Sequence, residues 1–416
     1  MNWHNIRRDF PSLNKKNEGK IPIYFDNACN TLRPRCVIDS MRIYFEDQPG
    51  CAGKRSSHYF SKETEEKCRV ARKEVADFIN ANEHEIVWTK NTTESINLVA
   101  NSFKIKKNQN VVCSIMDHHS LLLPFYKKCA DSGAELRIVE CKTDCTIAAE
   151  QFADKIDKNT ALVAITHASN VAGTILPVKE IIKIAHENGA LALVDGAQFI
   201  PHRALDVKKL DADFYCFSMH KMLGPSLGVL YGKEALLEDL NLFMVGGDTI
   251  RDVVYKDGKI FPQFLPAPKK FEAGLQNYAG IIGSGTAVEY LKKLGMERIE
   301  KHEIKLSKRI LEKLLQIQEV KIVGPLNESA RVATISLILK KKISAKDIAE
   351  YFDTELEKYR IMLRADAHCA NPFHYFLGLN PSKGEGTLRA SLYFYNTFDE
   401  IDIFAEELNN LLKRVE

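Results

Sequence analysis

The sequence of 416 residues is 45% hydrophobic and 27% charged, which is ordinary for a soluble globular protein with one large and one small domain. Its 58 basic and 55 acidic residues leave a net charge of +3, which argues against a nucleic-acid-binding protein because these usually carry a strongly basic surface. No apolar run approaches the roughly 20 residues of a membrane-spanning helix, and residues 1–4 open no signal peptide, so we expect a cytoplasmic protein without membrane contacts.

Ten cysteines are scattered along the chain without a close Cys-x-x-Cys pair. This spacing favours neither a zinc site nor a disulfide framework. We expect most of them to be reduced core residues, and only Cys369 has distinctive neighbours.

The first 25 residues predict a short polar helix and a linker, which we expect to pack with the small domain. A brief strand then enters a turn at Asp26-Asn27-Ala28. Residues 65–80 have helical spacing, and a strand at 86–89 leads into Asn91-Thr92-Thr93-Glu94. Thr92 or Thr93 would cap the next helix, whose free N–H groups can hold a phosphate dianion. A plain capping role would explain the same residues.

Apolar runs separated mostly by helical segments predict the βαβ repetition of a parallel α/β domain. These predicted strands cover residues 111–115, 136–140, 162–166, 191–194 and 213–218. Ligands collect at the carboxyl ends of such strands, so the residues that follow each run are candidate site residues.

Two of these runs end in Asp195 and Lys221. Pyridoxal phosphate requires such a pair, because a lysine holds it as a Schiff base while a carboxylate pairs with its ring nitrogen. Taken alone, Lys221 could be a surface lysine after a core strand, and Asp195 could cap the following helix.

A third run leads into Asp117-His118-His119. Adjacent histidines can indicate a metal site, but neighbours in sequence point apart and no carboxylate cluster accompanies them. We therefore expect no metal.

Beyond Tyr231 the pattern loosens through residues 246–270, and a long amphipathic helix is predicted over 287–316. Strands near 320–323 and 332–339 and helices near 344–352 and 399–413 follow. The predicted domains are a large one over residues 26–286 and a small α+β one over residues 287–416.

Four segments occur in one order: Asn-Thr-Thr-Glu-Ser-Ile-Asn at 91–97, Val-Asp-Gly-Ala-Gln at 194–198, Ser-Met-His-Lys at 218–221 and Arg-Ala-Ser-Leu-Tyr-Phe-Tyr-Asn-Thr at 389–397. With them the chain resembles class V aminotransferase-fold enzymes from about residue 24 to its end, and among these the group II cysteine desulfurases and selenocysteine lyases. The resemblance implies a fold-type I transferase with a mostly parallel seven-stranded sheet, bound pyridoxal phosphate and a homodimer.

The resemblance also implies roles for individual residues. Lys221 would attach the cofactor and move protons, Asp195 would pair with the ring nitrogen, and Arg389 would clamp the substrate carboxylate. His118 would stack on the ring and act as a catalytic residue, with a ring nitrogen able to move protons. Further implied contacts are Gln198 at the ring hydroxyl, Asn170 at the ring or the substrate carboxylate, and Thr92, Thr93, Ser218 and His220 around the phosphate.

Cys369 lies between Arg364 and a Pro- and Gly-containing loop, and matches the persulfide-carrying cysteine of similar enzymes. Arg364 and His368 are expected to supply positive charge, which lowers the pKa of a thiol and makes it nucleophilic. A buried structural cysteine is the alternative.

Two features depart from the pattern of the family. Leu275 stands where a threonine usually donates a phosphate contact to the second subunit, and the turn at residues 224–228 is one residue shorter. The predicted function is conversion of L-cysteine to L-alanine with the sulfur held on Cys369, from which a sulfur-acceptor protein would take it. An aminotransferase, a selenocysteine lyase or another C–S lyase, and a non-catalytic scaffold are the alternatives.

Overall fold

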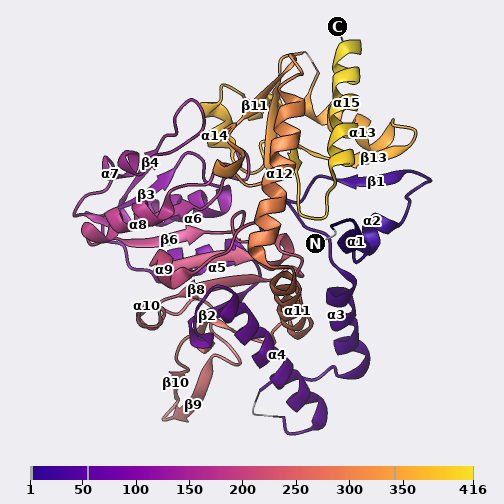
Figure 1. The fold of residues 1–416 in the computed structure, drawn as a ribbon. Coiled ribbons are helices and arrows are strands. Elements are labelled where there is room, and N and C mark those ends of the chain that lie inside the picture. The colour runs from indigo at the N-terminus through magenta and orange to yellow at the C-terminus, as the bar shows by residue number, and fades with distance from the viewer. Residues whose placement is uncertain (1–2, 54–55, 342, 416) are drawn as a thin grey trace.

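The centre of the molecule is a seven-stranded sheet in the order β2-β8-β7-β6-β5-β3-β4 (Figure 1). The structure, a computed structural model, describes residues 3–53, 56–341 and 343–415. Strand β8 runs antiparallel to both of its neighbours, and the other pairs are parallel, which confirms the expected mostly parallel sheet. The strands are β2 (Ile86–Thr89), β3 (Asn110–Ser114), β4 (Glu135–Val139), β5 (Thr160–Thr166), β6 (Leu191–Asp195), β7 (Phe214–Ser218) and β8 (Gly228–Gly232).

Both faces of this sheet are covered by helices. Val111 of β3 packs into one core with α5 (Thr92–Ser102) and α6 (His119–Ser132), whereas Val112 packs into the opposite core with α8 (Val178–Glu187). Strands buried on both faces are continuous apolar runs in sequence, and the five predicted strands are therefore confirmed to within two residues.

Two helices, α11 (Tyr278–Leu294) and α12 (Met296–Leu314), stand where one long helix was predicted, so that prediction was wrong. Gly295 separates them with a φ of +84°, a conformation that glycine adopts without steric cost. Its N–H closes α11 by donating to the Leu291 carbonyl at 2.9 Å. Buried apolar residues continue across the break, so hydrophobic spacing did not reveal it.

The C-terminal part of the chain forms a four-stranded antiparallel sheet in the order β11-β12-β15-β14. Helices α12 and α15 (Phe398–Arg414) pack with it around a common core, which confirms the α+β character expected here. The boundary expected after residue 286 falls inside α11, and the division into domains stays a prediction. The elements here are β11 (Val320–Val323), β12 (Thr334–Leu339), α13 (Ala345–Thr354), β14 (Arg364–Asp366), α14 (Asn371–Phe376) and β15 (Thr387–Ser391).

The N-terminal segment lies against this C-terminal part (Figure 1). After α1 (Trp3–Arg7) and α2 (Pro11–Asn14), strand β1 (Ile21–Tyr24) pairs in parallel with β13 (Tyr359–Met362). Arg7 forms an ion pair with Glu400 of α15 at 2.6 Å. The turn after β1 is thereby held beside β15, where it borders the site described below.

A hairpin of β9 (Ile250–Lys256) and β10 (Lys259–Phe264) projects from the body of the molecule, within the stretch where no regular element was predicted (Figure 1). Asp257 and Gly258 both have positive φ at its turn, as the favoured two-residue hairpin turns require. The Asp-Gly pair is a sequence signal for such a turn. The two strands were nevertheless not predicted, because they have no buried face and so show no alternation of apolar and polar residues.

The other helices connect these layers and are α3 (Arg35–Asp47), α4 (Tyr59–Phe78), α7 (Ala149–Ala153), α9 (Val207–Leu210) and α10 (Glu234–Asp239). Among the described residues, no helix combines the length and apolar character needed to cross a membrane. Within the same ranges, no three His, Cys, Asp or Glu side chains gather as a metal-binding group would require.

Candidate active site

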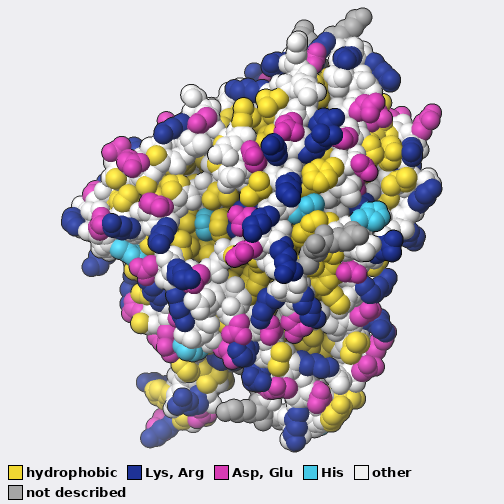
Figure 2. Space-filling model, viewed as in Figure 1, with side chains coloured by type: hydrophobic (Ala, Val, Ile, Leu, Met, Phe, Trp, Pro, Cys, Tyr) yellow, Lys and Arg dark blue, Asp and Glu magenta, His cyan; other side chains and the backbone are white. Residues whose placement is uncertain are grey.

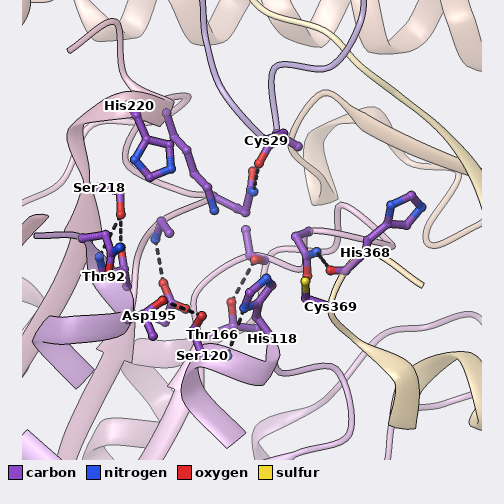
Figure 3. A pocket seen from close by; sticks show the side chains of 18 of the residues that line it. Cys29, Thr92, His118, Ser120, Thr166, Asp195, Ser218, His220, His368 and Cys369 are labelled. Carbon is purple, nitrogen blue, oxygen red and sulfur yellow. Dashed lines mark hydrogen bonds between the residues drawn. The ribbon is translucent and has the colours of Figure 1, made fainter. Parts of the chain in front are cut away.

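One cavity of about 290 Å³ lies at the carboxyl ends of the central strands and is bordered by the N-terminal turn and the C-terminal sheet (Figure 3). Every site residue predicted from the sequence lines it. These residues are Thr92, Thr93, His118, Asn170, Asp195, Gln198, Ser218, His220, Lys221, Cys369 and Arg389.

Asp195 and Lys221 face this cavity from the ends of neighbouring strands. Asp195 ends β6 and is buried, and its Oδ1 accepts the Ala197 N–H at 2.9 Å. A Cβ at the intervening Gly196 would stand 2.0 Å from the Tyr215 ring, so this tight turn requires glycine. Lys221 follows β7 in a short 3-10 helix.

The two charges act on each other inside the protein. Burial lowers the pKa of Lys221, and the Asp195 carboxylate partly opposes that shift. Burial likewise raises the pKa of Asp195, and Lys221 lowers it. A lysine whose ammonium form is disfavoured supplies the neutral amine that forms a covalent bond to an aldehyde.

His118 precedes α6, and its Nδ1 accepts the Ser120 N–H at 3.0 Å. The turn that carries His118 is fixed by the buried Asp117, whose carboxylate accepts hydrogen bonds from the Ser114 and Thr166 N–H groups at 2.6 and 2.9 Å. Burial and the nearby Lys221 lower the pKa of His118 to about 3. The imidazole is therefore neutral at physiological pH, with its proton on Nε2.

Hydroxyl groups gather at the first turn of α5. The Asn91 side chain, rather than Thr92 or Thr93, caps this helix by accepting the Glu94 N–H at 3.0 Å, so the predicted cap was wrong by one residue. Thr92 is thereby free to contact the Ser218 hydroxyl through its N–H at 2.9 Å and its Oγ1 at 2.5 Å.

Thr93 Oγ1, also in the first turn of α5, lies 2.7 Å from the hydroxyl of Ser120, which is in the first turn of α6. The Nδ1 atom of His220 is buried and has no hydrogen-bond partner. Hydroxyls, an orphaned imidazole nitrogen and a helix N-terminus together form a site for an anion.

Arg389, from β15, is 2% exposed and reaches the cavity opposite the sheet. Its Nη1 donates to the Asn170 carbonyl at 3.0 Å and its Nη2 to Asp26 Oδ1 at 3.2 Å, whereas its Nε is buried without a partner. The Asn170 amide donates in turn to the His368 carbonyl at 2.8 Å. Gln198 donates to the Ala28 carbonyl at 2.6 Å, so it ties the N-terminal turn to β6.

Cys369 is exposed and has a left-handed backbone with φ of +57°. Its carbonyl accepts the His119 N–H at 2.8 Å, which places the segment beside the first turn of α6. The side chain lies on the same cavity as Lys221 (Figure 3).

The prediction that His368 supplies positive charge to this thiol was wrong. The His374 Nδ1 can only donate to the Ala370 carbonyl, so its Nε2 accepts the Thr387 hydroxyl, whose oxygen accepts the His368 Nε2–H at 2.9 Å. Burial and the Arg389 charge also lower the pKa of His368 far below its usual value. His368 is thus a neutral ring that anchors the cysteine segment to β15.

Arg364 stays charged but is directed elsewhere. Its guanidinium holds the Asp26 carboxylate with two parallel hydrogen bonds of 3.0 and 2.9 Å, and its Nη2 also lies 2.8 Å from the Cys29 sulfur. Asp26 and Cys29 were missed as site residues, because only their contacts with residues more than 330 positions away bring them here. In the sequence, only the turn predicted after the first strand, at Asp26-Asn27-Ala28, pointed to this segment.

Comparisons with known proteins agree with this geometry. The sequence profile of the family described as "Aminotransferase class-V" matches residues 23–404. The chain is 38% identical over 402 residues to a cysteine desulfurase of Salmonella typhimurium, with 95% of each protein covered. Its fold matches the apo structure of a cysteine desulfurase from Thermococcus onnurineus with a TM-score of 0.89, 36% identity and 98% of each chain covered. It also matches the cysteine desulfurase CsdA of Escherichia coli with a TM-score of 0.88 and 29% identity over the whole of both chains.

Proposed function

The chain belongs to the class V aminotransferase family, and from this premise we propose that it is a pyridoxal-phosphate-dependent cysteine desulfurase. It converts L-cysteine to L-alanine and keeps the sulfur as a persulfide on Cys369. The observation that carries the proposal is the convergence of a half-buried lysine, a buried carboxylate, a buried arginine and an exposed cysteine on one cavity. Removal of sulfur from a cysteine substrate needs a lysine to hold the cofactor, a carboxylate at its ring nitrogen, an arginine for the substrate carboxylate and a thiol to take the sulfur.

The residues of the cavity fit pyridoxal phosphate. Lys221 would hold its aldehyde carbon, Asp195 its ring nitrogen, and the α5 N-terminus with Ser218 and the unpartnered His220 its phosphate. His118, Gln198 and Asn170 would contact the ring. When bound, the cofactor supplies an electron sink that weakens bonds at the substrate α-carbon.

Substrate binding falls to Arg389. The unpartnered Nε and the planar guanidinium of Arg389 suit a carboxylate, and the hydrogen bond from Nη1 to the Asn170 carbonyl fixes the orientation of the guanidinium. Lys221 accepts the α-proton and returns it, because it lines the cavity and its lowered pKa favours the neutral amine that can take up a proton.

Cys369 performs the sulfur step. Its thiolate attacks the substrate sulfur, a sulfur–sulfur bond forms, and the carbon–sulfur bond breaks with its electron pair left on carbon. That carbon then takes a proton and becomes the alanine methyl group. Exposure of Cys369 leaves the persulfide accessible to a sulfur-acceptor protein.

We also propose a homodimer in the cytoplasm. The β9–β10 hairpin exposes Tyr255, Ile260 and Phe261 by 76%, 68% and 52%. Figure 2 shows hydrophobic and basic side chains side by side where the hairpin projects. Exposed apolar groups of this kind favour contact with a second chain. All ten cysteines are free, as is usual in a reducing compartment.

A product assay tests the function. The purified protein with bound cofactor is incubated with L-cysteine, and alanine, sulfide and protein-bound sulfane sulfur are quantified. We expect alanine and sulfur in equal amounts, and no transfer of the amino group to an added 2-oxo acid. Amino-group transfer without alanine-linked sulfur would identify an aminotransferase instead, and a strong preference for selenocysteine would identify a selenocysteine lyase.

A further inference from the structure

Cys369 lies in a strained turn of residues 367–370, here called the cysteine turn, which joins β14 to α14. The Ala370 N–H donates to the Ala367 carbonyl at 2.8 Å and closes the turn. Its two central residues, His368 and Cys369, both have positive φ, at +49° and +57°. Glycine and asparagine favour this conformation, whereas histidine and cysteine adopt it at a cost in free energy. Such a turn persists only where surrounding contacts fix it.

One residue at the start of α6 holds this segment at two points. The backbone N–H of His119 donates to the Cys369 carbonyl at 2.8 Å, and the His119 Nε2 atom accepts the Asn371 N–H at 3.2 Å. Asn371 is the first residue of α14, and the leading N–H groups of a helix have no partner within it. The two hydrogen bonds therefore bracket Cys369, one at its own carbonyl and one two residues later.

The ring of His119 accepts this hydrogen bond only in its neutral form. Nε2 must be unprotonated to accept the Asn371 N–H, so the ring proton is on Nδ1. Burial lowers the pKa of His119 below its usual value, which favours the neutral ring at physiological pH. His119 is therefore a hydrogen-bond acceptor for the cysteine segment rather than a source of positive charge beside the thiol.

The same short segment also serves the cofactor side of the cavity. His118 and Cys369 both line the cavity, whereas His119 is not among the described residues that line it (Figure 3). The ring centroids of the two histidines are 6.4 Å apart, and Asp117 accepts two backbone N–H groups and so fixes the turn before them. One fixed turn thus carries a ring that faces the cavity and a ring that holds the cysteine turn, so it relates the thiol to the cofactor site.

We propose that His119 is a positioning residue that holds Cys369 where its sulfur can reach the substrate. This role rests on the proposed function, in which Cys369 attacks the substrate sulfur. Reacting atoms must approach to about 3–3.5 Å, and a displacement of about 1 Å can cost about a hundredfold in rate. Without the bond from Asn371, the far side of the cysteine turn loses its contact with α6, and the strained backbone at Cys369 can relax.

Steady-state kinetics of the full-length protein with bound cofactor test this role. His119→Ala removes the ring acceptor but keeps the backbone bond to Cys369. We expect kcat for alanine formation to fall at least about tenfold, whereas KM for L-cysteine and the cofactor absorbance stay unchanged because Arg389 and the cofactor contacts remain in place. His119→Gln offers an amide oxygen to the Asn371 N–H and should restore most of the lost turnover. His84→Ala, at a side chain that is 49% exposed, is the control and should match wild type.

Hydrogen–deuterium exchange tests the contact without relying on activity. The peptide that contains the Asn371 amide should exchange several-fold faster in His119→Ala than in wild type, and His119→Gln should again resemble wild type. Unchanged exchange or turnover in His119→Ala, or a loss that His119→Gln does not restore, would overturn the role of His119. A wild-type protein that formed no alanine, with the expected exchange pattern intact, would instead overturn the proposed function on which this role rests.

Discussion

Arg389 and Asp26 face each other across the candidate active site, with Arg389 Nη2 3.2 Å from Asp26 Oδ1 although 363 positions separate them in sequence. The same carboxylate is held by Arg364 through two further hydrogen bonds. One carboxylate between two guanidinium groups leaves one positive charge uncompensated at the cavity. A substrate carboxylate can supply the missing charge, and the unpartnered Nε of Arg389 marks where it is needed.

Substitution of Arg389 should therefore impair substrate binding more than cofactor binding. Hydrogen bonds to charged groups contribute about 1.5–3 kcal/mol, so Arg389→Ala should raise KM for L-cysteine by about tenfold to a hundredfold. Arg389→Lys keeps the charge but not the fork and should lie between this variant and wild type. Steady-state alanine formation and cofactor absorbance measure both effects; loss of cofactor with an unchanged KM would reverse the assignment.

Lys221→Ala should abolish covalent attachment of the cofactor, because Lys221 lines the cavity and burial lowers the pKa of its amine. Borohydride treatment followed by mass spectrometry should show pyridoxal phosphate fixed to wild type but not to this variant. Lys209→Ala, at a side chain that is 84% exposed, is the matched control and should be labelled like wild type. Undiminished labelling of Lys221→Ala would assign the role to another lysine.

The pattern of successes and failures in the sequence predictions has a physical cause. Strands buried on both faces, such as β5, produce continuous apolar runs that can be recognised in the sequence, and these runs also mark the polar residues at their ends. Asp195 and Lys221 were therefore accessible from sequence. The Asp26–Arg389 contact joins distant segments through packing, and no local pattern specifies it.

Other features were hidden for local reasons. The break at Gly295 interrupts the backbone but not the apolar pattern, and the β9–β10 strands have no buried face to produce alternation. The protonation state of His368 also depends on burial and on a hydrogen-bond chain that sequence does not reveal.

Acid should destabilise the protein partly through His167. This ring is buried, stacks on Phe199 with centroids 3.4 Å apart and lies 2.9 Å from the Tyr215 hydroxyl. Burial lowers its pKa to about 3 from the ordinary 6.5. Between these two values the His167 ring is protonated in the unfolded chain but neutral in the folded protein. Its contribution to the free energy of unfolding is therefore present above about pH 6.5 and is lost as the pH falls toward about 3.

Urea unfolding at several pH values measures this contribution. Each such histidine can steepen the fall in the free energy of unfolding by about 1.4 kcal/mol per pH unit inside that window. His167→Gln should be less stable at neutral pH but should lose stability less steeply between about pH 6 and 4. Parallel curves for the variant and wild type would show that His167 does not titrate on unfolding.

The proposed dimer should weaken when charges replace apolar side chains on one face of the hairpin. Ile260 pairs directly with Tyr255 across the two strands, so both side chains lie on the same face. Burial of one such side chain contributes about 1.5–3 kcal/mol, and Tyr255→Asp with Ile260→Asp should raise the dimer dissociation constant at least about a hundredfold. Sedimentation velocity measures this, with Lys259→Ala at the hairpin as control; an unchanged dimer would place the interface elsewhere.

Cys369→Ser tests the sulfur step most directly. Serine cannot form a persulfide, whereas Lys221, Asp195 and Arg389 remain in place, so the variant should keep the cofactor spectrum and its change on adding L-cysteine. Alanine formation should fall by at least about a thousandfold, since catalysis by an activated nucleophile is lost. Cys36→Ser, at another exposed cysteine outside the cavity, is the matched control and should retain full turnover. Alkylation before and after turnover, followed by peptide mapping, should find sulfane sulfur on the Cys369 peptide of wild type. Undiminished alanine from Cys369→Ser would remove this thiol from the reaction and favour a lyase that releases sulfur without a persulfide.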